Sequence, residues 1–101
     1  MSRTIKLSRK ASIRLEEILS YMKTNWSQKV KYEFVDKLDK GLKLLSEFPE
    51  SHPKSELQQD LHIYVLTKQT TVFYKFSETE LIIVTLFDNR QDPKRILDDV
   101  Q

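Results

Sequence analysis

The sequence predicts an α+β domain in which a strand and two helices precede three antiparallel strands and a short C-terminal helix. Two observations predict this class. Apolar residues recur every three to four positions through the first half of the chain, and they alternate with polar residues through much of the second half. The 101 residues, of which 39% are hydrophobic, suit one compact domain and are too few for two independent cores. The domain is therefore expected to span residues 1–101.

The first expected element is a short strand at residues 4–7, where Ile5 and Leu7 alternate with polar residues. Ser8 can then cap a helix, because its hydroxyl can accept a hydrogen bond from a free N–H group of the first turn. The apolar side chains of this helix recur as one helical stripe: Ala11, Leu15, Ile18, Leu19 and Met22. Such a stripe predicts a helix that packs one face on a core.

A second helix is expected after a break at residues 25–27, with Ser27 as its N-cap and Pro49 near its end. Its inner face would hold Val30, Phe34, Leu38, Leu42 and Leu45. Its outer face carries acid-before-base pairs at i,i+4, namely Glu33 with Lys37, Asp36 with Lys40, and Asp39 with Lys43. So short a connection predicts an antiparallel helical hairpin packed on one face of the sheet. Gly41, the only glycine, is expected to allow a close approach of backbone.

The second half of the chain begins with residues 49–60, which contain two prolines and no periodic pattern and are expected to form a surface loop. Three strands are predicted at residues 61–65, 71–76 and 81–87, joined by connections short enough for hairpins. The last strand is nearly all apolar and should be buried on both faces. With the N-terminal strand at one edge, these make an antiparallel sheet of about four strands. Asp92-Pro93 then opens a helix from Lys94 to about Val100.

Composition excludes several classes of protein. There is no cysteine, which removes disulfides and thiolate metal sites and fits the cytoplasm. The formal net charge of +2 is well below the positive charge of a dedicated nucleic-acid-binding protein. No apolar run is long enough for a signal peptide or a membrane span. His52 and His62 stand without a carboxylate motif, and one glycine cannot make a glycine-rich phosphate loop, so neither a metal nor a cofactor is expected.

The order of the elements, together with several short stretches, resembles the RelE/ParE toxin family, a plasmid stabilisation family, over almost the whole chain. These stretches are Trp26-Ser27, Phe48-Pro49, the strand at 71–76 and the closing run at 86–93. The resemblance implies a growth-inhibiting toxin of a type II toxin-antitoxin system, silenced by a cognate antitoxin that folds along it. Some members of the family enter the ribosomal A site and cut messenger RNA. Others bind DNA gyrase and stall it.

Cutting RNA requires a base for the 2′-hydroxyl, cations for the phosphorane and an acid for the leaving oxygen. Ribosome-dependent members carry mostly basic groups for this on the last strands, with an arginine after the final strand and an aromatic or histidine near the C-terminus. The resemblance, with the turn that borders the family's ligand-binding face, gives four candidate catalytic side chains: Arg90, His62, Tyr64 and Lys68. Two positions depart from the pattern, because Thr71 replaces an arginine and Ile96 falls near the C-terminal aromatic position.

Each candidate also has a structural explanation. His62 and Tyr64 can be packing residues of a strand, Lys68 lies in a turn where polar residues are common, and Arg90 can pair with Asp88 or Asp92. The missing groups favour a toxin that acts by binding a target such as DNA gyrase. A ribosome-dependent endoribonuclease, and a toxin fold that has lost its activity, remain the alternatives, so whether the chain is an enzyme stays open at this point.

Overall fold

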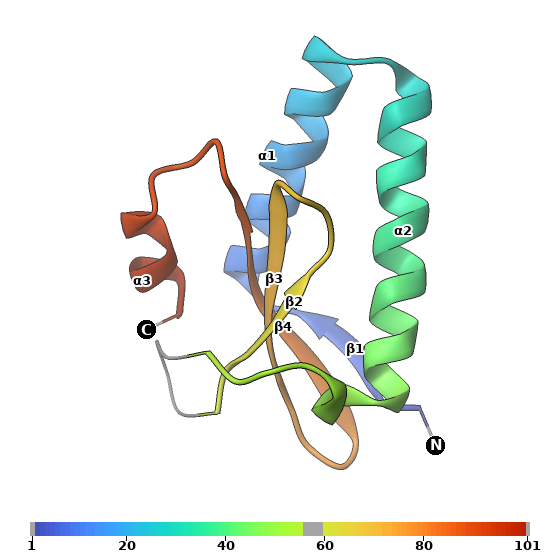
Figure 1. Cartoon of the computed structure of the whole chain (residues 1–101), viewed down its shortest axis with the longest axis vertical. Coiled ribbons are helices and arrows are strands. Elements are labelled where there is room, and N and C mark those ends of the chain that lie inside the picture. Colours follow the sequence, from blue (N-terminus) through green and yellow to red (C-terminus); the bar gives the residue numbers. More distant parts are fainter. Residues whose placement is uncertain (1, 56–59, 101) are drawn as a thin grey trace.

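The chain is described by a computed structural model that covers residues 2–55 and 60–100. Its elements, in chain order, are β1 (Thr4–Leu7), α1 (Arg9–Asn25), α2 (Gln28–Glu47), the 3-10 turn η1 (Pro49–Ser51), β2 (His62–Val65), β3 (Thr70–Phe76), β4 (Glu80–Asp88) and α3 (Lys94–Val100). Figure 1 shows α1 and α2 as an antiparallel hairpin, with α3 on the opposite side of the strands. The predicted α+β class, N-terminal strand, helical hairpin and short last helix are confirmed.

Both long helices begin at the serines that the sequence marks as N-caps. The Ser8 hydroxyl accepts a hydrogen bond from the backbone N–H of Ala11 at 3.0 Å, and the Ser27 hydroxyl accepts one from Val30 at 3.3 Å. These bonds satisfy N–H groups that a helix start leaves without partners. Among the helices of residues 2–55 and 60–100, none has the length and apolar character needed to cross a membrane.

The main core lies between the helical hairpin and the sheet. Its buried side chains from the helices are Ala11, Ile18, Met22, Phe34, Leu38, Leu42 and Leu45, and those from the β half are Leu66, Val72, Tyr74, Leu81, Ile83 and Leu86. The Tyr74 hydroxyl donates a hydrogen bond to the carbonyl oxygen of Pro49 at 2.6 Å, which ties β3 to η1. Burial raises the pKa of Tyr74 to about 12, so this phenol keeps the proton that it donates.

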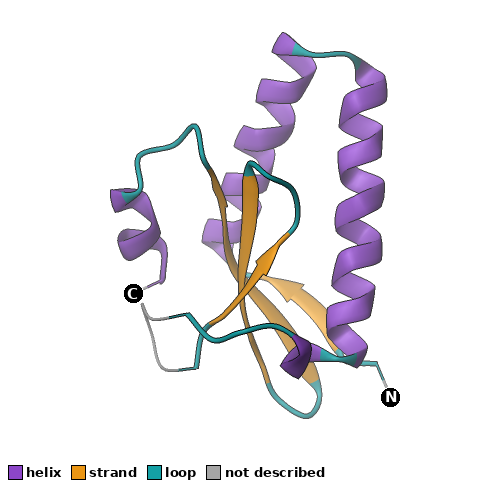
Figure 2. Cartoon of the chain, viewed as in Figure 1, coloured by secondary structure: helices purple, strands orange, loops and turns teal. Residues whose placement is uncertain are grey.

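The sheet has the order β1-β4-β3-β2, and it is mixed where the sequence predicted an antiparallel sheet. The pairs β2–β3 and β3–β4 are antiparallel, whereas β1 pairs with β4 in parallel, with Ile5 opposite Leu81. The reason is the helical hairpin, which returns the chain to the end where β1 begins, as the hydrogen bond from the Arg3 N–H to the Ser46 carbonyl shows. Strands β2 and β4 therefore run in the direction of β1 (Figure 2). The placement of β1 at one edge is confirmed.

Residues 49–55 are more ordered than the loop that the sequence predicts at 49–60. After η1, Lys54 forms a bridge with His62, and the N–H of Ile63 donates to the carbonyl of Pro53 at 2.9 Å. This pairing has a physical reason, because β2 is an edge strand whose outward N–H groups need acceptors. Residues 56–59 of the predicted loop lie outside the described residues.

A second, smaller cluster lies on the other face of the sheet, under α3. Its members are Leu61, Phe73 and Val100, with Ile63, Val84, Phe87 and Ile96 packed against them. Strand β4 therefore has apolar side chains covered on both faces, as its sequence predicted. A bulge supports this packing, since Phe73 lies opposite Thr85 and Tyr74 lies opposite Ile83, which leaves Val84 as the extra residue.

A buried ion pair fastens α3 to α1 and β4. The Nε and Nη2 atoms of Arg14 donate to the two carboxylate oxygens of Asp99 at 2.7 and 2.9 Å, and the Thr85 hydroxyl donates to the same carboxylate at 2.9 Å. The Arg14 side chain is 10% exposed and that of Asp99 is 3% exposed. Glu17 extends the network, because it pairs with both Arg14 and Arg95. These contacts hold a helix of seven residues that is too short to be stable alone.

Candidate functional site

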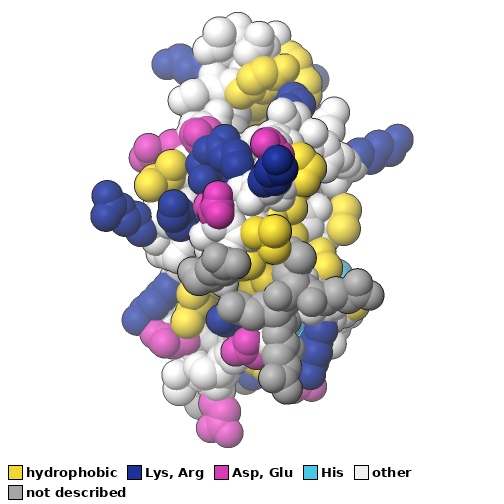
Figure 3. All heavy atoms as spheres, turned by 90° about the vertical axis from the view of Figure 1, so that its left-hand side faces the viewer, with side chains coloured by type: hydrophobic (Ala, Val, Ile, Leu, Met, Phe, Trp, Pro, Cys, Tyr) yellow, Lys and Arg dark blue, Asp and Glu magenta, His cyan; other side chains and the backbone are white. Residues whose placement is uncertain are grey.

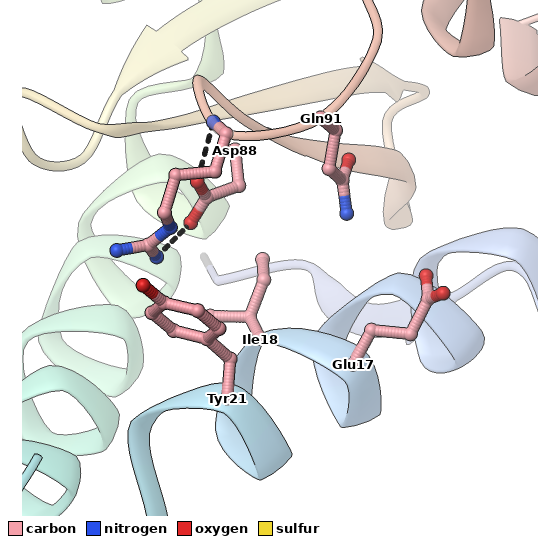
Figure 4. A pocket seen from close by; sticks show the side chains of 6 residues that line it. Glu17, Ile18, Tyr21, Asp88 and Gln91 are labelled. Carbon is pink, nitrogen blue, oxygen red and sulfur yellow. Dashed lines mark hydrogen bonds and ion pairs between the residues drawn. The ribbon is translucent and has the colours of Figure 1, made fainter. Parts of the chain in front are cut away.

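Arg90 is held in place by a buried carboxylate, Asp88, and two aromatic rings, Tyr21 and Trp26. Figure 4 shows Asp88 and Tyr21 on facing sides of this arrangement. The backbone N–H of Arg90 donates to Asp88 Oδ1 at 2.9 Å, and its Nη2 donates to Asp88 Oδ2. The Cζ atom of Arg90 lies 4.1 Å from the ring centroid of Tyr21 and 5.3 Å from that of Trp26, both within cation–π range. The Asp88 side chain is 3% exposed and the Arg90 side chain 29% exposed. Of the two carboxylates considered as partners of Arg90, Asp88 is therefore the one used, and it is buried.

A hollow of about 220 Å³ lies beside this arrangement, between α1 and the end of β4. It is lined by Glu17, Ile18, Tyr21, Asp88, Arg90 and Gln91. Figure 4 shows Glu17 rising from α1 and Gln91 reaching toward it from the loop after β4. The lining thus combines apolar surface with polar groups at its edge, which is the composition of many binding sites.

Replacement of Arg90 by alanine is expected to lower the free energy of unfolding by about 1–3 kcal/mol, because it leaves the buried Asp88 carboxylate without its charged partner. An exposed ion pair would cost about 1 kcal/mol at most. Arg90→Lys keeps the charge but loses the planar group that stacks on Tyr21, so it should recover only part of the loss. Thermal unfolding beside the exposed Lys94→Ala control measures these differences. Unchanged melting of Arg90→Ala would contradict the structural role of the guanidinium.

His62 lies near the opposite end of β2 from the turn that leads toward Arg90. It is 7% exposed, and its ring stacks on Tyr74 at 5.3 Å between centroids and contacts Phe76 at 5.1 Å. Its Nδ1 lies 3.1 Å from the carbonyl oxygen of His52, so this nitrogen carries the proton and donates it. The imidazole is therefore packed on the hairpin side of the sheet.

Tyr64 packs against the main core and against the one glycine of the chain. A Cβ atom at Gly41 would stand 2.7 Å from the Tyr64 hydroxyl oxygen and 2.9 Å from its Cε2 atom. The expectation that Gly41 admits neighbouring backbone was therefore wrong, because the group that approaches α2 is a side chain from β2. Tyr64 also makes an edge contact with the ring of His52 at 4.8 Å.

A double-mutant cycle tests the contact between Gly41 and Tyr64. In a Tyr64→Ala background, Gly41→Ala should stabilise the protein by about 1 kcal/mol, because alanine has the higher helix propensity. In the parent chain the same change should lose or reverse that gain, since the new methyl group meets the Tyr64 ring. Urea denaturation of the four proteins measures the coupling, which is expected to be about 1 kcal/mol or more. Additive effects would show that Tyr64 does not require glycine at this position.

Lys68 is exposed in the turn between β2 and β3, and this turn is joined to the loop that carries Arg90. The Asn89 side-chain amide donates to the Lys68 carbonyl at 2.8 Å, and the Asn89 N–H donates to the Gln69 carbonyl at 2.8 Å. The structure therefore brings Lys68 and Arg90 to one end of the sheet and places His62 elsewhere. The catalytic role of the four candidates stays a prediction.

The sequence did not reveal the aromatic partners of Arg90. Trp26 was identified as part of the break between two helices and of a stretch shared with the family, without a link to Arg90, and Tyr21 lies outside the apolar stripe of α1. No group of three or more His, Asp or Glu side chains that could hold a metal ion occurs in the part of the chain that the structure describes.

Comparison with known proteins agrees with this architecture. The family model described as the ParE toxin of the type II toxin-antitoxin system parDE matches residues 5–93. The chain therefore belongs to the ParE toxin family and is a toxin of the type II toxin-antitoxin class. No curated protein sequence matches it.

Solved structures share the fold at low sequence identity. A chain of the chromosomal ParDE system from P. aeruginosa has a TM-score of 0.71 and 16% identity, and the match covers 86% of this chain and 96% of that one. A chain of the E. coli DinJ-YafQ toxin-antitoxin complex has a TM-score of 0.61 and 14% identity, with 89% and 96% covered. At these identities the likeness concerns the fold alone.

Proposed function

We propose that this toxin inhibits growth by binding DNA gyrase without cutting RNA, and that a cognate antitoxin neutralises it. The observation that supports the proposal most strongly is that three of the four candidate catalytic side chains are engaged in structural contacts. His62 is buried between aromatic rings, Tyr64 covers Gly41, and Arg90 is tied to Asp88. A group held in this way is poorly available to take or give a proton during cleavage, whereas binding needs only a complementary surface.

The charge distribution supports the same proposal. Figure 3 shows Lys and Arg side chains mixed with Asp and Glu side chains on the face that includes α3. Pairs such as Arg95 with Glu17 account for part of this mixture. RNA-binding surfaces instead carry clustered positive charge, because phosphate contacts dominate their affinity.

The alternative is ribosome-dependent cleavage of messenger RNA. One observation favours it, because the exposed Lys68 and the partly exposed Arg90 lie on joined loops at one end of the sheet. The likeness to the toxin-antitoxin complex DinJ-YafQ concerns the fold and does not decide between the targets. In this mechanism Lys68 and Arg90 would stabilise the phosphorane. A group other than the buried His62 would have to accept the proton of the 2′-hydroxyl.

Two readouts after induced expression separate these functions. Binding to gyrase should raise the DNA-damage response and leave messenger RNA 5′ ends unchanged, and purified toxin should inhibit supercoiling by purified gyrase. Ribosome-dependent cleavage should produce new 5′ ends within codons and no DNA-damage response. Growth without inhibition, from a toxin that is folded and free of antitoxin, would favour a toxin fold that has lost its activity. Co-expression of the product of the adjacent reading frame should restore growth in either active case.

A further inference from the structure

The buried Asp88 carboxylate lies beside a hydroxyl group that it does not use. Thr70, which is 1% exposed, stands directly opposite Asp88 in the register of β3 and β4. Its Oγ1 atom is buried and has no hydrogen-bond partner within residues 2–55 and 60–100. Buried hydroxyl groups normally have a partner, so an unpartnered one beside a charged group requires an explanation.

The backbone of Thr70 places the two side chains close together. The Thr70 N–H donates to the Thr67 hydroxyl, and the Thr70 carbonyl accepts from the N–H groups of Leu66 and Thr67. Both backbone groups of Thr70 therefore point toward β2, which makes Thr70 and Asp88 a non-hydrogen-bonded pair of the β3–β4 ladder. In such a pair the Cα atoms are about 4.5 Å apart and the side chains are closest. Rotation of Thr70 to another staggered rotamer can thus bring Oγ1 to the carboxylate.

Arg90 supplies the donors that Asp88 does use. Its backbone N–H binds Oδ1 and its Nη2 binds Oδ2, and Figure 4 marks both bonds at Asp88 with dashed lines. The backbone bond is fixed by the turn after β4. The side-chain bond is lost whenever the guanidinium turns toward solvent, and the Arg90 side chain is 29% exposed. Departure of the guanidinium alone would leave a buried carboxylate short of a donor, which is unfavourable.

We propose that the contact between Asp88 and Arg90 is a latch with two positions. In the closed position the guanidinium binds Asp88. In the open position it binds an oxyanion of the target, a carboxylate or a phosphate, and the Thr70 hydroxyl donates a hydrogen bond to Asp88 in its place. Opening then leaves no buried oxygen of Asp88 without a donor. The biological role of the latch rests on the target binding proposed above, whereas its two positions can be tested without the target.

Trp26, the single tryptophan of the chain, reports on the latch, because the Cζ atom of Arg90 lies 5.3 Å from its ring centroid. The probe is inorganic phosphate, titrated into the full-length toxin at constant ionic strength and followed by tryptophan fluorescence. The parent should show a saturable change that Arg90→Gln lacks. Thr70→Val should weaken phosphate binding about tenfold or more, because it removes a hydrogen bond to a charged group that forms only in the open position.

Thr70→Val should weaken binding without lowering stability. Valine has nearly the shape of threonine, and it replaces a buried hydroxyl that has no partner in the closed position. The melting temperature should therefore stay equal or rise. Thr70→Ser keeps the hydroxyl and should keep the affinity. Thr71→Val makes the same change at the next residue of β3, on the other face of the sheet, and should leave the affinity within about twofold of the parent.

Asp88→Asn is expected to act in the opposite direction. A neutral amide holds the guanidinium less tightly than a carboxylate does, so the latch should open more readily and phosphate should bind about threefold or more tightly. In this background Thr70→Val should have a smaller effect than in the parent, since a hydrogen bond to a neutral oxygen contributes less. The melting temperature of each variant shows that it is folded.

The same variants connect the latch to the proposed target through inhibition of supercoiling by purified gyrase. Thr70→Val should inhibit about tenfold less strongly, and Thr71→Val should match the parent. Binding measured with gyrase alone and with gyrase on DNA separates the two sources of the oxyanion. Weaker binding of Thr70→Val to gyrase alone identifies a carboxylate of the enzyme, and weaker binding only when DNA is present identifies a phosphate. Either result supports the latch.

Equal phosphate affinity of Thr70→Val and the parent would overturn the latch, and so would the absence of a saturable signal in the parent. A lower melting temperature of Thr70→Val would also overturn it, because the hydroxyl would then have a partner in the closed position. Equal inhibition of gyrase by Thr70→Val and the parent would remove the latch from target binding. No inhibition of gyrase by the parent, together with the expected phosphate affinities, would overturn the proposed target and leave the latch standing.

Discussion

Replacement of Asp99 by asparagine is expected to lower the free energy of unfolding by about 3 kcal/mol, because it leaves the buried Arg14 guanidinium with only Glu17, whose side chain is 42% exposed, as a counter-charge. The side chains of this ion pair are 10% and 3% exposed, so water cannot take the place of the lost partner. Arg14 also cannot become neutral in the variant, because the pKa of a guanidinium is far above neutral even without the hydrogen bond to Asp99 that raises it in the parent. Chemical denaturation of the parent and the variant measures the difference.

The neighbouring Asp98 provides a matched control, because it is an exposed carboxylate on the same helix. Asp98→Asn should change the free energy of unfolding by under about 0.5 kcal/mol. A double variant, Arg14→Met with Asp99→Leu, should regain much of the stability lost in Asp99→Asn, because an apolar pair carries no cost of burying charge. Equal stability of Asp98→Asn and Asp99→Asn would mean that the ion pair does not hold α3.

The same carboxylate makes stability depend on pH. Hydrogen bonds from Arg14, and secondarily from Thr85, hold the pKa of Asp99 below its ordinary value, against burial, which raises it. A depressed pKa means that the folded state binds this proton less readily than the unfolded chain does, where the pKa is about 3.9. The contribution of Asp99 is therefore fully present above the unfolded pKa and is lost as pH falls through the folded pKa. Chemical denaturation at several acidic pH values should show that the free energy of unfolding falls less with decreasing pH in Asp99→Asn than in the parent.

The local part of the fold could be predicted because its causes are local. Ser8 and Ser27 cap helices through bonds to residues three positions away. The direction of β1 relative to β4 depends instead on where the hairpin returns the chain, and no residue of β1 encodes it. The buried ion pair left one mark in the sequence, since Arg14 interrupts the apolar stripe of α1, but its partner Asp99 lies 85 positions further along.

The candidate site, like the fold, could be predicted only in its local part. The family resemblance pointed to Arg90, and its neighbours in sequence included the carboxylate that it binds. Tyr21 and Trp26 reach Arg90 only because the hairpin packs against the end of the sheet, which brings together residues about seventy positions apart. Gly41 could be identified as a point of close approach because it is a glycine within a predicted helix. Tyr64, the residue that approaches it, could not be identified, because only the packing of β2 against α2 brings the two together.

Replacement of Leu38 by alanine is expected to lower the free energy of unfolding by about 2–5 kcal/mol, because Leu38 lies in the core between the hairpin and the sheet. Leu38 is 7% exposed. For a domain of this size, each kcal/mol lowers the melting temperature by roughly 4–8 °C, so the change should be plain in a thermal scan.

Leu44→Ala is the control that separates burial from helix propensity, since it makes the same substitution in α2 at a residue that is 54% exposed. It should cost less than about 1 kcal/mol. Growth inhibition by Leu38→Ala should return when cells are grown cool enough for the variant to fold, because Leu38 is a buried residue of the core. If Leu38→Ala had the same melting temperature as Leu44→Ala, the inner face of α2 would be wrongly assigned. If it folded and stayed harmless at low temperature, Leu38 would have a role in toxicity beyond packing.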